Sequence, residues 1–382
     1  MVEYAVLLSL IALALVGPVF GLGQQVGNRF QSITNTLSNG SGSDGGGITP
    51  PPTTTTPPPT TSPTTPDPET PDPDPDTGGS GGGEGGGTGD QKWDGDHDDL
   101  SLPAYAVYSA EDKSLEFFRD KDDMPNVKEL SRTGKLVTMI FTGFEDSPSP
   151  DLKSLWKGPG FSPLTNRINT VRFVDRTRPR NVSSWFSSSY YYNDTSIGNF
   201  RDLMSADLTK LDTSRCSDFS RLFEGQSNLY EIKGLEGLDT SRVTKTDFMF
   251  SSCAKLEKLD GVANWDTKIL RSALGMFGSC TSLQTLDLSR WDTSSLELVG
   301  SADPLSSSSA SKGMFAMCEN LTSVGDISSW EIPNLTQAGW MFFRCGKLQT
   351  DCSKWVTPKI DNNYKSTFNL YAPGVKPPAS WS

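Results

Sequence analysis

A motif of about 27 residues recurs along the C-terminal half of this chain and restricts the architectures that the chain can adopt. Residues 239–265 show it most clearly, as DTSRVTKTDFMFSSCAKLEKLDGVANW. The copies align on six phenylalanines that lie 27, 27, 38, 27 and 26 residues apart, namely Phe223, Phe250, Phe277, Phe315, Phe342 and Phe368. A fixed period of this size is typical of supersecondary units that stack into a solenoid.

Three other residue types return at the same place in most units. A cysteine follows the phenylalanine by three residues, a leucine follows three later, and a tryptophan closes the unit. These residues are Cys253, Cys280, Cys318 and Cys345, then Leu256, Leu283, Leu321 and Leu348, then Trp265, Trp291, Trp330 and Trp355. Such residues form columns inside a solenoid, because one repeat alone cannot bury its apolar face. We therefore expect these columns to be core and not a ligand or metal site.

All six cysteines lie between Cys216 and Cys352, and four of them belong to one column. Side chains of one column point in the same direction and not at one another, an arrangement that disulfide geometry disfavours. We expect buried, reduced thiols. The pair Cys345 and Cys352 is the most plausible exception.

The pattern DTSxV, MFxxCxxL and LDLSxW closely resembles the BspA-like leucine-rich-repeat surface proteins of bacteria, most clearly over residues 239–291. The resemblance covers roughly residues 171–372. It implies a right-handed solenoid with short parallel strands, for example at residues 285–289. The first unit departs from the pattern with Gln226 at the cysteine position and Leu238 at the tryptophan position, as expected of a terminal turn.

Residues 98–200 are predicted to form a β-rich N-terminal cap and a degenerate first turn. The expected strands are a hairpin of residues 104–108 and 114–118, followed by residues 136–141 and 169–174. Such a cap would cover the apolar end of the first turn. Trp185 and Phe186 take the Met-Phe position of that turn. The solenoid itself is expected over residues 201–372, with a C-terminal tail at residues 373–382.

Residues 1–38 contain an apolar run in which no charged residue stands between Glu3 and Arg29. The run is long enough to cross a membrane. A secretory signal peptide would have a basic start, whereas this segment opens with a glutamate. We expect a helix that is either an ordinary membrane anchor or part of an apolar assembly in which Glu3 finds a partner.

The same segment resembles the N-terminal helix of the Flp-type (type IVb, tight-adherence) pilins, which carry a Glu-Tyr pair ahead of the apolar run, here Glu3 and Tyr4. The resemblance implies that Glu3 pairs with the N-terminal amine of a neighbouring pilin subunit while the helices bundle into a filament core. One departure is that the glutamate is third here and fifth in the mature family members. We therefore interpret Met1 as an internal methionine taken as the start.

Residues 39–97 read as a disordered Pro/Thr- and Gly-rich linker with a stiff, extended centre between flexible glycine joints. At its end Asp94, Asp96 and Asp98 stand at every second position, a pattern that suggests a calcium site. The spacing does not complete an EF-hand loop, because Asp99 and Tyr105 stand where glycine and glutamate are needed. We expect a solvated acidic linker end, with calcium as a weak alternative and no other cofactor or metal.

Two insertions interrupt the repeats, at residues 190–199 and 300–312. Loops of this kind often decorate the binding face of repeat proteins. The first contains Tyr190, Tyr191 and Tyr192, and tyrosine is common at recognition hot spots. These tyrosines are our ligand-binding candidates, and the alternative is that they pack under the cap as structure.

Charge and composition exclude several functions. The first hundred residues hold 13 of the 46 acidic and 2 of the 34 basic residues, so the remainder carries 33 acids and 32 bases. A nearly neutral folded part without basic clusters argues against nucleic-acid binding. The single histidine, His97, lies in the linker, which excludes a His-based catalytic site in the folded domain. We expect no enzyme, although paired carboxylates for glycoside hydrolysis are not recognisable from sequence.

The predicted fold is thus mainly β with short helical turns: a pilin-like α-helix, a disordered linker, and a β-capped leucine-rich-repeat-like solenoid. This order suits a pilus-associated cell-surface adhesin that is extracellular and membrane-inserted before assembly. Its expected partners are pilin subunits, the inner membrane before assembly, and a host-cell or bacterial surface protein or glycan. The alternative is a minor structural pilin that caps or spaces the filament. A third interpretation is a surface glycan hydrolase.

Overall fold

The computed structural model describes residues 99–120, 124–147, 167–188, 202–301, 312–360 and 365–381. The predicted N-terminal helix, with Glu3 and Tyr4, and the linker lie outside these residues. So do the calcium candidates Asp94, Asp96 and Asp98 and the ligand candidates Tyr190, Tyr191 and Tyr192. Within the described ranges no helix has the length and apolar character that a membrane crossing requires.

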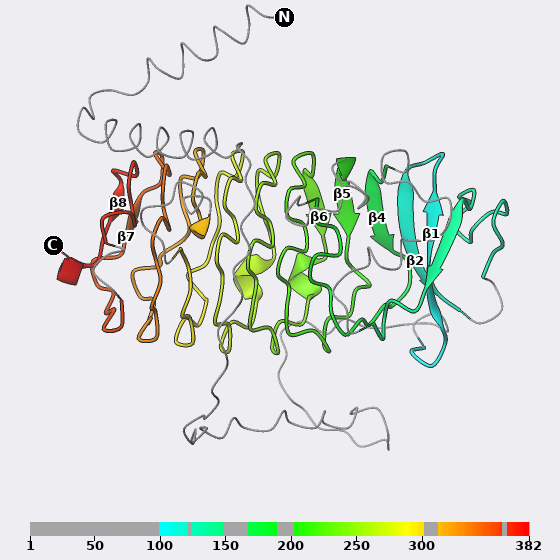
Figure 1. The fold of residues 1–382 in the computed structure, drawn as a ribbon, viewed down its shortest axis with the longest axis horizontal. Coiled ribbons are helices and arrows are strands. Elements are labelled where there is room, and N and C mark those ends of the chain that lie inside the picture. Colours follow the sequence, from blue (N-terminus) through cyan, green and yellow to red (C-terminus); the bar gives the residue numbers. More distant parts are fainter. Residues whose placement is uncertain are drawn as a thin grey trace, which may run out of the picture. The chain divides into compact units, whose positions relative to one another are not determined.

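A six-stranded mixed sheet begins the described chain (Figure 1). Its strands are β1 (Ala104–Ser109), β2 (Ser114–Arg119), β3 (Met139–Thr142), β4 (Thr170–Phe173), β5 (Ser205–Asp207) and β6 (Glu231–Lys233), in the order β3-β1-β2-β4-β5-β6. Strands β1, β2 and β3 pair antiparallel, whereas β2, β4, β5 and β6 pair parallel. The predicted hairpin is therefore confirmed. The cap joins the solenoid through the β2–β4 pair without a break in the sheet.

The third predicted strand, residues 136–141, is shorter than expected. Leu136 forms an isolated antiparallel bridge with Leu130, and β3 starts only at Met139. Val137 donates to the carbonyl of Glu129 at 2.9 Å. The first residues of this stretch thus complete a local turn before the chain reaches the sheet.

Between β6 and β7 (Thr350–Asp351) the coils are joined mainly by single parallel bridges. One series links Lys258, Thr285 and Ser323. The predicted strand at residues 285–289 is therefore wrong, because only Thr285 makes a bridge. The Asp287 carboxylate accepts a hydrogen bond from the amide of Ser289 at 3.1 Å, and this local bond turns the chain away from an extended path.

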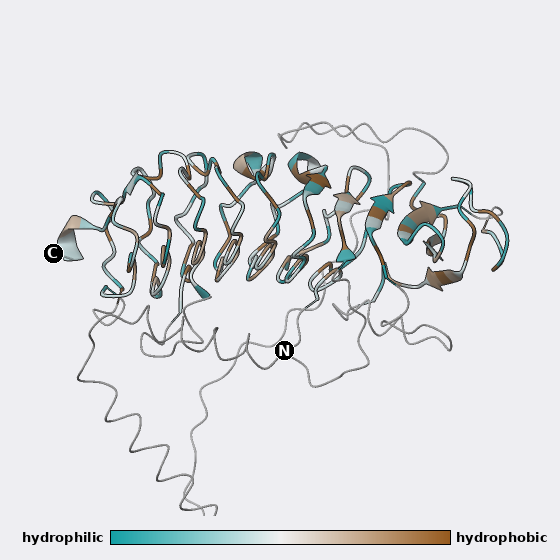
Figure 2. Cartoon of the chain, turned by 90° about the horizontal axis from the view of Figure 1, so that it is seen from above, coloured by the Kyte–Doolittle hydropathy of each residue, from teal (hydrophilic) through white to brown (hydrophobic). Residues whose placement is uncertain are grey.

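A second series of bridges runs along the other ladder of the solenoid, through Asp218, Lys245, Ser272, Leu298 and Gln337. The tight turns between the ladders include the 3-10 helices η3 (Leu235–Gly237) and η4 (Val262–Asn264). In Figure 2 apolar stretches recur at the same place in successive coils, as the columns require.

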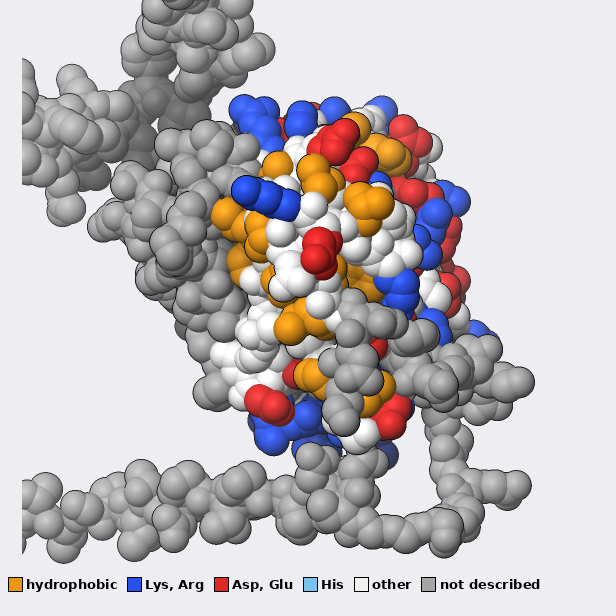
Figure 3. All heavy atoms as spheres, turned by 90° about the vertical axis from the view of Figure 1, so that its right-hand side faces the viewer, with side chains coloured by type: hydrophobic (Ala, Val, Ile, Leu, Met, Phe, Trp, Pro, Cys, Tyr) orange, Lys and Arg blue, Asp and Glu red, His pale blue; other side chains and the backbone are white. Residues whose placement is uncertain are grey.

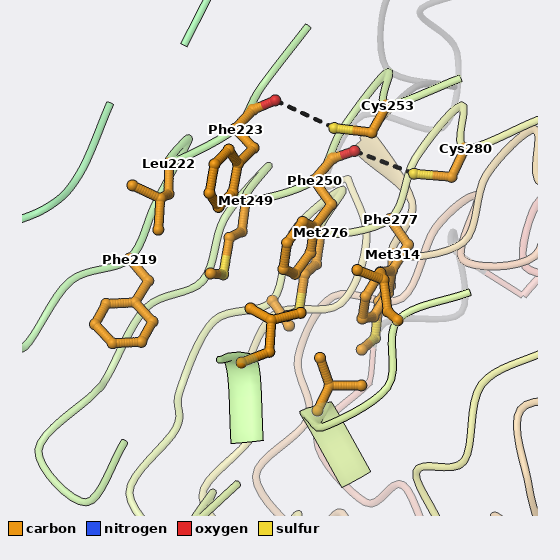
Figure 4. Packing of buried hydrophobic residues seen from close by; sticks show 14 of the residues in the cluster. Phe219, Leu222, Phe223, Met249, Phe250, Cys253, Met276, Phe277, Cys280 and Met314 are labelled. Carbon is orange, nitrogen blue, oxygen red and sulfur yellow. Dashed lines mark hydrogen bonds between the residues drawn. The ribbon is translucent and has the colours of Figure 1, made fainter. Parts of the chain in front are cut away.

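The phenylalanine column forms a continuous stack through the core (Figure 4). From Phe223 to Phe342 neighbouring ring centroids lie 5.4 to 6.1 Å apart, with interplanar angles of 7 to 8°. Phe186 extends the stack at 5.6 Å from Phe223, so the structure places it in the degenerate first turn. The column is buried throughout, as expected of core residues.

Each column cysteine donates its thiol proton to the coil before it. The Sγ atoms of Cys253, Cys280, Cys318 and Cys345 lie 3.2, 3.1, 3.0 and 3.0 Å from the carbonyl oxygens of Phe223, Phe250, Phe277 and Phe315. Figure 4 shows two of these bonds. In the first unit Gln226 stands at the cysteine position and its Nε2 donates to the carbonyl of Phe186. All six thiols are free, Cys345 and Cys352 included, so the disulfide exception is wrong.

Burial raises the pKa of Cys280 and Cys345 to about 12, and it raises the pKa of Cys253 and Cys318 well above its ordinary value. In the unfolded chain these thiols ionise above about pH 8.5. The stability that these thiols contribute to the fold is therefore fully present below that pH, and it is lost as the pH rises toward 12. The expected slope is about 1.4 kcal/mol per pH unit for each buried thiol.

Urea unfolding of the full chain between about pH 7.5 and about pH 10.5 measures this slope. Tyrosines and lysines also titrate in that window, so Cys280→Ala is the control. The slope of the unfolding free energy against pH should be smaller in Cys280→Ala than in the unchanged chain, by the contribution of one thiol. An identical slope in both proteins would show that the Cys280 thiol ionises equally well in the folded state.

The tryptophan column is tied to the preceding coil in a similar way. The indole Nε1 atoms of Trp265, Trp291, Trp330 and Trp355 donate to the carbonyl oxygens of Leu235, Val262, Leu288 and Ile327 at 2.7 to 3.1 Å. A buried N–H without a partner costs free energy. The indoles therefore fill the core and link neighbouring coils at once.

Both ends of the solenoid are closed. At the cap, the ring of Phe117 stacks 4.3 Å from Phe173 and 6.0 Å from Trp185. At the other end β7 (Thr350–Asp351) pairs with β8 (Val375–Lys376), and Trp381 packs edge-on against Phe368 at 4.9 Å. Residues 375–381, the last of which form η7 (Ala379–Trp381), are thus part of the closing turn and not a free tail.

Candidate binding surface

Two exposed columns flank the buried leucine column and run along one side of the solenoid. They occupy the fifth and seventh positions after each phenylalanine, and we call them the polar ladder. The fifth positions hold Asn228, Lys255, Ser282, Asn320 and Lys347, and the seventh hold Tyr230, Glu257, Gln284, Thr322 and Gln349. All are exposed or half-buried, because the leucine at the sixth position turns inward and its neighbours turn outward.

Backbone hydrogen bonds hold these positions in step from coil to coil. The amide of Gln284 donates to the carbonyl of Glu257 at 3.0 Å, and that of Thr322 donates to the carbonyl of Gln284 at 2.8 Å. The amide of Tyr230 donates to the carbonyl of Met204 at 3.0 Å. Equivalent side chains are therefore spaced by about one interstrand distance, roughly 4.8 Å.

Some side chains of the polar ladder are fixed by their neighbours and others are not. The ammonium of Lys347 donates to the side-chain oxygen of Asn320 at 2.6 Å, and the amide of Asn320 donates to the carbonyl of Thr281 at 2.7 Å. Among the described residues the Glu257 carboxylate and the Gln284 side-chain amide have no hydrogen-bond partner. These two groups are available to a ligand.

A groove of about 430 Å³ follows the polar ladder across four coils. It is lined by Glu257, Ser282, Gln284, Thr285, Asn320, Thr322 and Lys347. The lining has one carboxylate and one ammonium, so its formal charges cancel, and the other side chains are amides and hydroxyls. Its volume is within the range of small-molecule sites. Such a surface is suited to a ligand rich in hydroxyl groups and without net charge.

The polar ladder begins beside the first predicted insertion. Tyr230 is 55% exposed, and Met204, in the preceding coil, is 40% exposed. The insertion leaves the described chain after Ser188, whose amide donates to the carbonyl of Glu224 at 2.8 Å. It returns at Asp202, two residues before Met204. The anchor at Asp202 thus lies near the Tyr230 end of the ladder, because Tyr230 bonds to the carbonyl of Met204.

Sequence reasoning missed Tyr230, Glu257 and Gln284. They share one position in three consecutive units but differ in residue type, so no conserved column marks them. The available signal was the alternation around the leucine column, which places both neighbours of each buried leucine on the surface.

A second exposed surface contains aromatic side chains at a corner of the last coils. The rings of Trp340 and Phe343 lie 5.0 Å apart, and Tyr371 lies 5.9 Å from Phe343. Tyr371 is 67% exposed, and the Arg344 guanidinium lies 5.5 Å from the centre of the Phe343 ring. This aromatic corner offers contact area but belongs to no described groove.

The end face of the cap carries apolar side chains among charged ones (Figure 3). Met124, Val127, Leu130 and Leu136 are 41 to 65% exposed. Of these, Leu130 and Leu136 are bridge partners. Exposed apolar side chains that lie together are a feature of protein interaction sites.

A cleft of about 380 Å³ lies beside the cap strands and contains carboxylates. Glu145 pairs with the buried guanidinium of Arg119, and Asp120 accepts a hydrogen bond from the hydroxyl of Tyr105 at 2.9 Å. Burial and the Asp120 bond raise the pKa of Tyr105. Asp146 lies within ion-pair distance of two arginines. Since each of these carboxylates is engaged, the described residues of the cleft present no free acid pair. Within the described residues no group of three or more His, Cys, Asp or Glu side chains is placed to hold a metal ion.

Comparison with known families matches the repeat region. Residues 186–302 and 304–376 match a family described as "Mycoplasma protein of unknown function, DUF285". This match agrees with the resemblance to BspA-like repeats and does not extend over residues 1–38. No curated protein and no solved structure matches the chain.

Proposed function

We propose that this chain, whose repeat region matches the DUF285 family, is a pilus-associated cell-surface adhesin. Residues 1–38 join it to the pilin subunits of a tight-adherence pilus after insertion in the inner membrane. Residues 39–97 form the stalk, and the solenoid presents the recognition surface outside the cell. The observation that carries this proposal is the polar ladder, with its groove on a domain whose core is closed at both ends.

A closed solenoid is a suitable carrier of a recognition surface because it holds side chains from different coils in fixed positions. The groove combines residues from four coils, and the stacked columns beneath them restrict their backbones. A preorganised surface loses less conformational entropy on binding than a flexible one. The ligand is a surface glycan or protein of a host cell or another bacterium.

Adhesion by piliated cells tests the proposal. A chain that lacks residues 99–381 should still enter pili, while the cells should lose attachment to a susceptible surface. The control is a strain whose chain lacks only residues 53–65 of the stalk, which should retain attachment. Normal attachment without residues 99–381 would rule out an adhesin function for the solenoid.

Replacing Glu3 with alanine should prevent incorporation into pili without unfolding the solenoid. The glutamate charge is expected to pair with the N-terminal amine of a neighbouring subunit in the apolar bundle, and removal of one partner of a buried pair costs several kcal/mol. Immunoblots of sheared pili measure incorporation. The matched control is Glu84→Ala in the linker, which should assemble normally. Wild-type incorporation of Glu3→Ala would contradict the pilin role of this residue.

The exposed apolar end face of the cap favours one alternative, a minor structural pilin that spaces or caps the filament. In that case Leu130→Ser and Leu136→Ser should alter pilus length or subunit stoichiometry, whereas removal of the solenoid should leave attachment unchanged. A surface glycan hydrolase is the weakest interpretation, since the carboxylates described at the cap cleft are engaged in ion pairs and hydrogen bonds.

A further inference from the structure

The polar ladder repeats along the solenoid axis, and this direction constrains its ligand. Tyr230, Glu257 and Gln284 take the same position in three consecutive coils. Backbone bonds between coils set the spacing from Glu257 to Gln284 and from Gln284 to Thr322, at roughly 4.8 Å per step. A ligand that contacts each coil in turn therefore needs a repeating unit of similar length. Linear chains of hexopyranose sugars have such a unit.

An extended polypeptide fits this surface less well. Peptides bind to sheets by adding a strand to a free edge. Here the backbone groups of Glu257, Gln284 and Thr322 already bond from coil to coil, so the ladder offers no edge. A peptide laid along the axis would run across the strands and would use side chains alone.

The chemistry of the lining also favours an uncharged sugar chain. The Glu257 carboxylate accepts hydroxyl protons, the Gln284 amide both donates and accepts, and Lys347 has donors beyond its bond to Asn320. In the groove lining Glu257 and Lys347 cancel in charge, so the groove itself favours neither a polyanion nor a polycation. Lys255, beside Tyr230 on the ladder, donates to the side-chain oxygen of Asn228 at 2.8 Å. At the end of the ladder Tyr230 offers an exposed ring on which the apolar face of a sugar can stack.

We propose that the groove binds a linear, uncharged polysaccharide of hexopyranose units that lies along the solenoid axis. In the groove the sugars contact Glu257, Gln284 and Lys347, and one further sugar, beyond the groove lining, stacks on Tyr230. The inference rests on the proposed adhesin function and names its ligand class. Host and bacterial glycans share this chemistry.

Binding of chain-length series tests the axial arrangement. The full chain is titrated by calorimetry with unbranched neutral oligomers of glucose, mannose, galactose and N-acetylglucosamine, and with oligouronates of the same lengths. At least one neutral series should bind, and its affinity should rise with each sugar until the oligomer spans the steps from Tyr230 to Lys347. It should then level off. Binding of no neutral series, or tighter binding of the oligouronates, would overturn the proposal.

Source is tested with the oligomer series that binds. Inhibition of attachment by polysaccharide extracted from host cells indicates a host glycan, and inhibition by bacterial polysaccharide indicates a bacterial one. If neither extract inhibits attachment while the pure oligomer does, the proposed ligand class is not the one that the cells use for adhesion.

Matched substitutions test the location. Gln284→Ala and Tyr230→Ser should each weaken oligomer binding roughly tenfold, since each removes one contact. Gln337→Ala on the other ladder and Tyr371→Ser at the aromatic corner should leave binding unchanged. All four substitutions are on exposed or half-buried side chains, so the fold should persist. Equal losses of oligomer affinity in a variant and its control would show that the groove is not the binding site.

Adhesion assays then separate the two proposals. If piliated cells with Gln284→Ala attach as well as the wild type while deletion of residues 99–381 abolishes attachment, the solenoid is an adhesin but the groove is not its site. If cells with the deletion also attach normally, the adhesin function itself is wrong.

Discussion

Replacing Gly313 with alanine should destabilise the solenoid by about 3 kcal/mol or more, because the new methyl group has no space. A Cβ at this position would overlap the carbonyl oxygen of Trp340 and would lie 2.9 Å from the amide nitrogen of Met341. Both neighbours are backbone atoms of the next coil, so no side-chain rotation relieves the overlap. The coils themselves would have to separate.

Urea unfolding of the full chain, followed by circular dichroism, measures this effect. The matched control is Gly346→Ala, where a Cβ meets no atom within 4 Å and the backbone is not left-handed. That substitution should change the stability by less than about 0.5 kcal/mol or should increase it slightly. Equal unfolding midpoints for the two variants would show that the coils of Phe315 and Phe342 adjust without cost.

The Gly313 position also shows where a repeat pattern fails as a guide. It lies two residues before the column phenylalanine, where other coils carry Arg221, Phe248 and Trp340 with positive φ of 61, 57 and 67°. Gly313 is outside that conformation, and the contact with Trp340 excludes any side chain. Pattern alignment treats the position as freely variable. Only the path of the backbone shows that this coil needs glycine.

The core could be predicted from sequence because each column repeats one residue type. Phe250, Cys253 and Trp265 are buried as expected, and the β1–β2 hairpin forms where alternation and its turn indicated. The identity of their polar partners was not predictable. The bond from the Cys253 thiol to the Phe223 carbonyl depends on the stagger between coils, which spacing along the chain does not contain.

Local side-chain bonds explain other differences. The segment at residues 285–289 has strand-like composition. However, the Asp287 carboxylate accepts a hydrogen bond from the amide of Ser289, and the extended path ends after one bridge. The polar ladder was missed because its function depends on neighbours one coil away. Glu257 and Gln284 are 27 residues apart in sequence and adjacent in space.

The Phe277→Ala variant should lose about 3 to 5 kcal/mol, the usual cost of removing a buried phenylalanine. Phe277 is fully buried in the middle of the stack, with its ring centre 5.9 Å from Phe250 and 5.6 Å from Phe315. The cavity would interrupt the stack at its centre. In a solenoid each coil is stabilised by its neighbours, so a central defect weakens two interfaces at once.

Phe248→Ala is the matched control, since this phenylalanine lies in the adjacent coil but is only half-buried. Its ring contacts the Arg221 guanidinium, whose carbon lies 4.6 Å from the ring centre. Loss of such an exposed cation–π contact should cost about 0.5 to 1 kcal/mol. Hydrogen exchange then locates the defect: in Phe277→Ala the amides of the coils around Phe250 and Phe315 should lose protection before those of β1 and β2. Uniform loss of protection along the chain would instead indicate that the cap and all coils unfold as one cooperative unit, in which the stack has no local role.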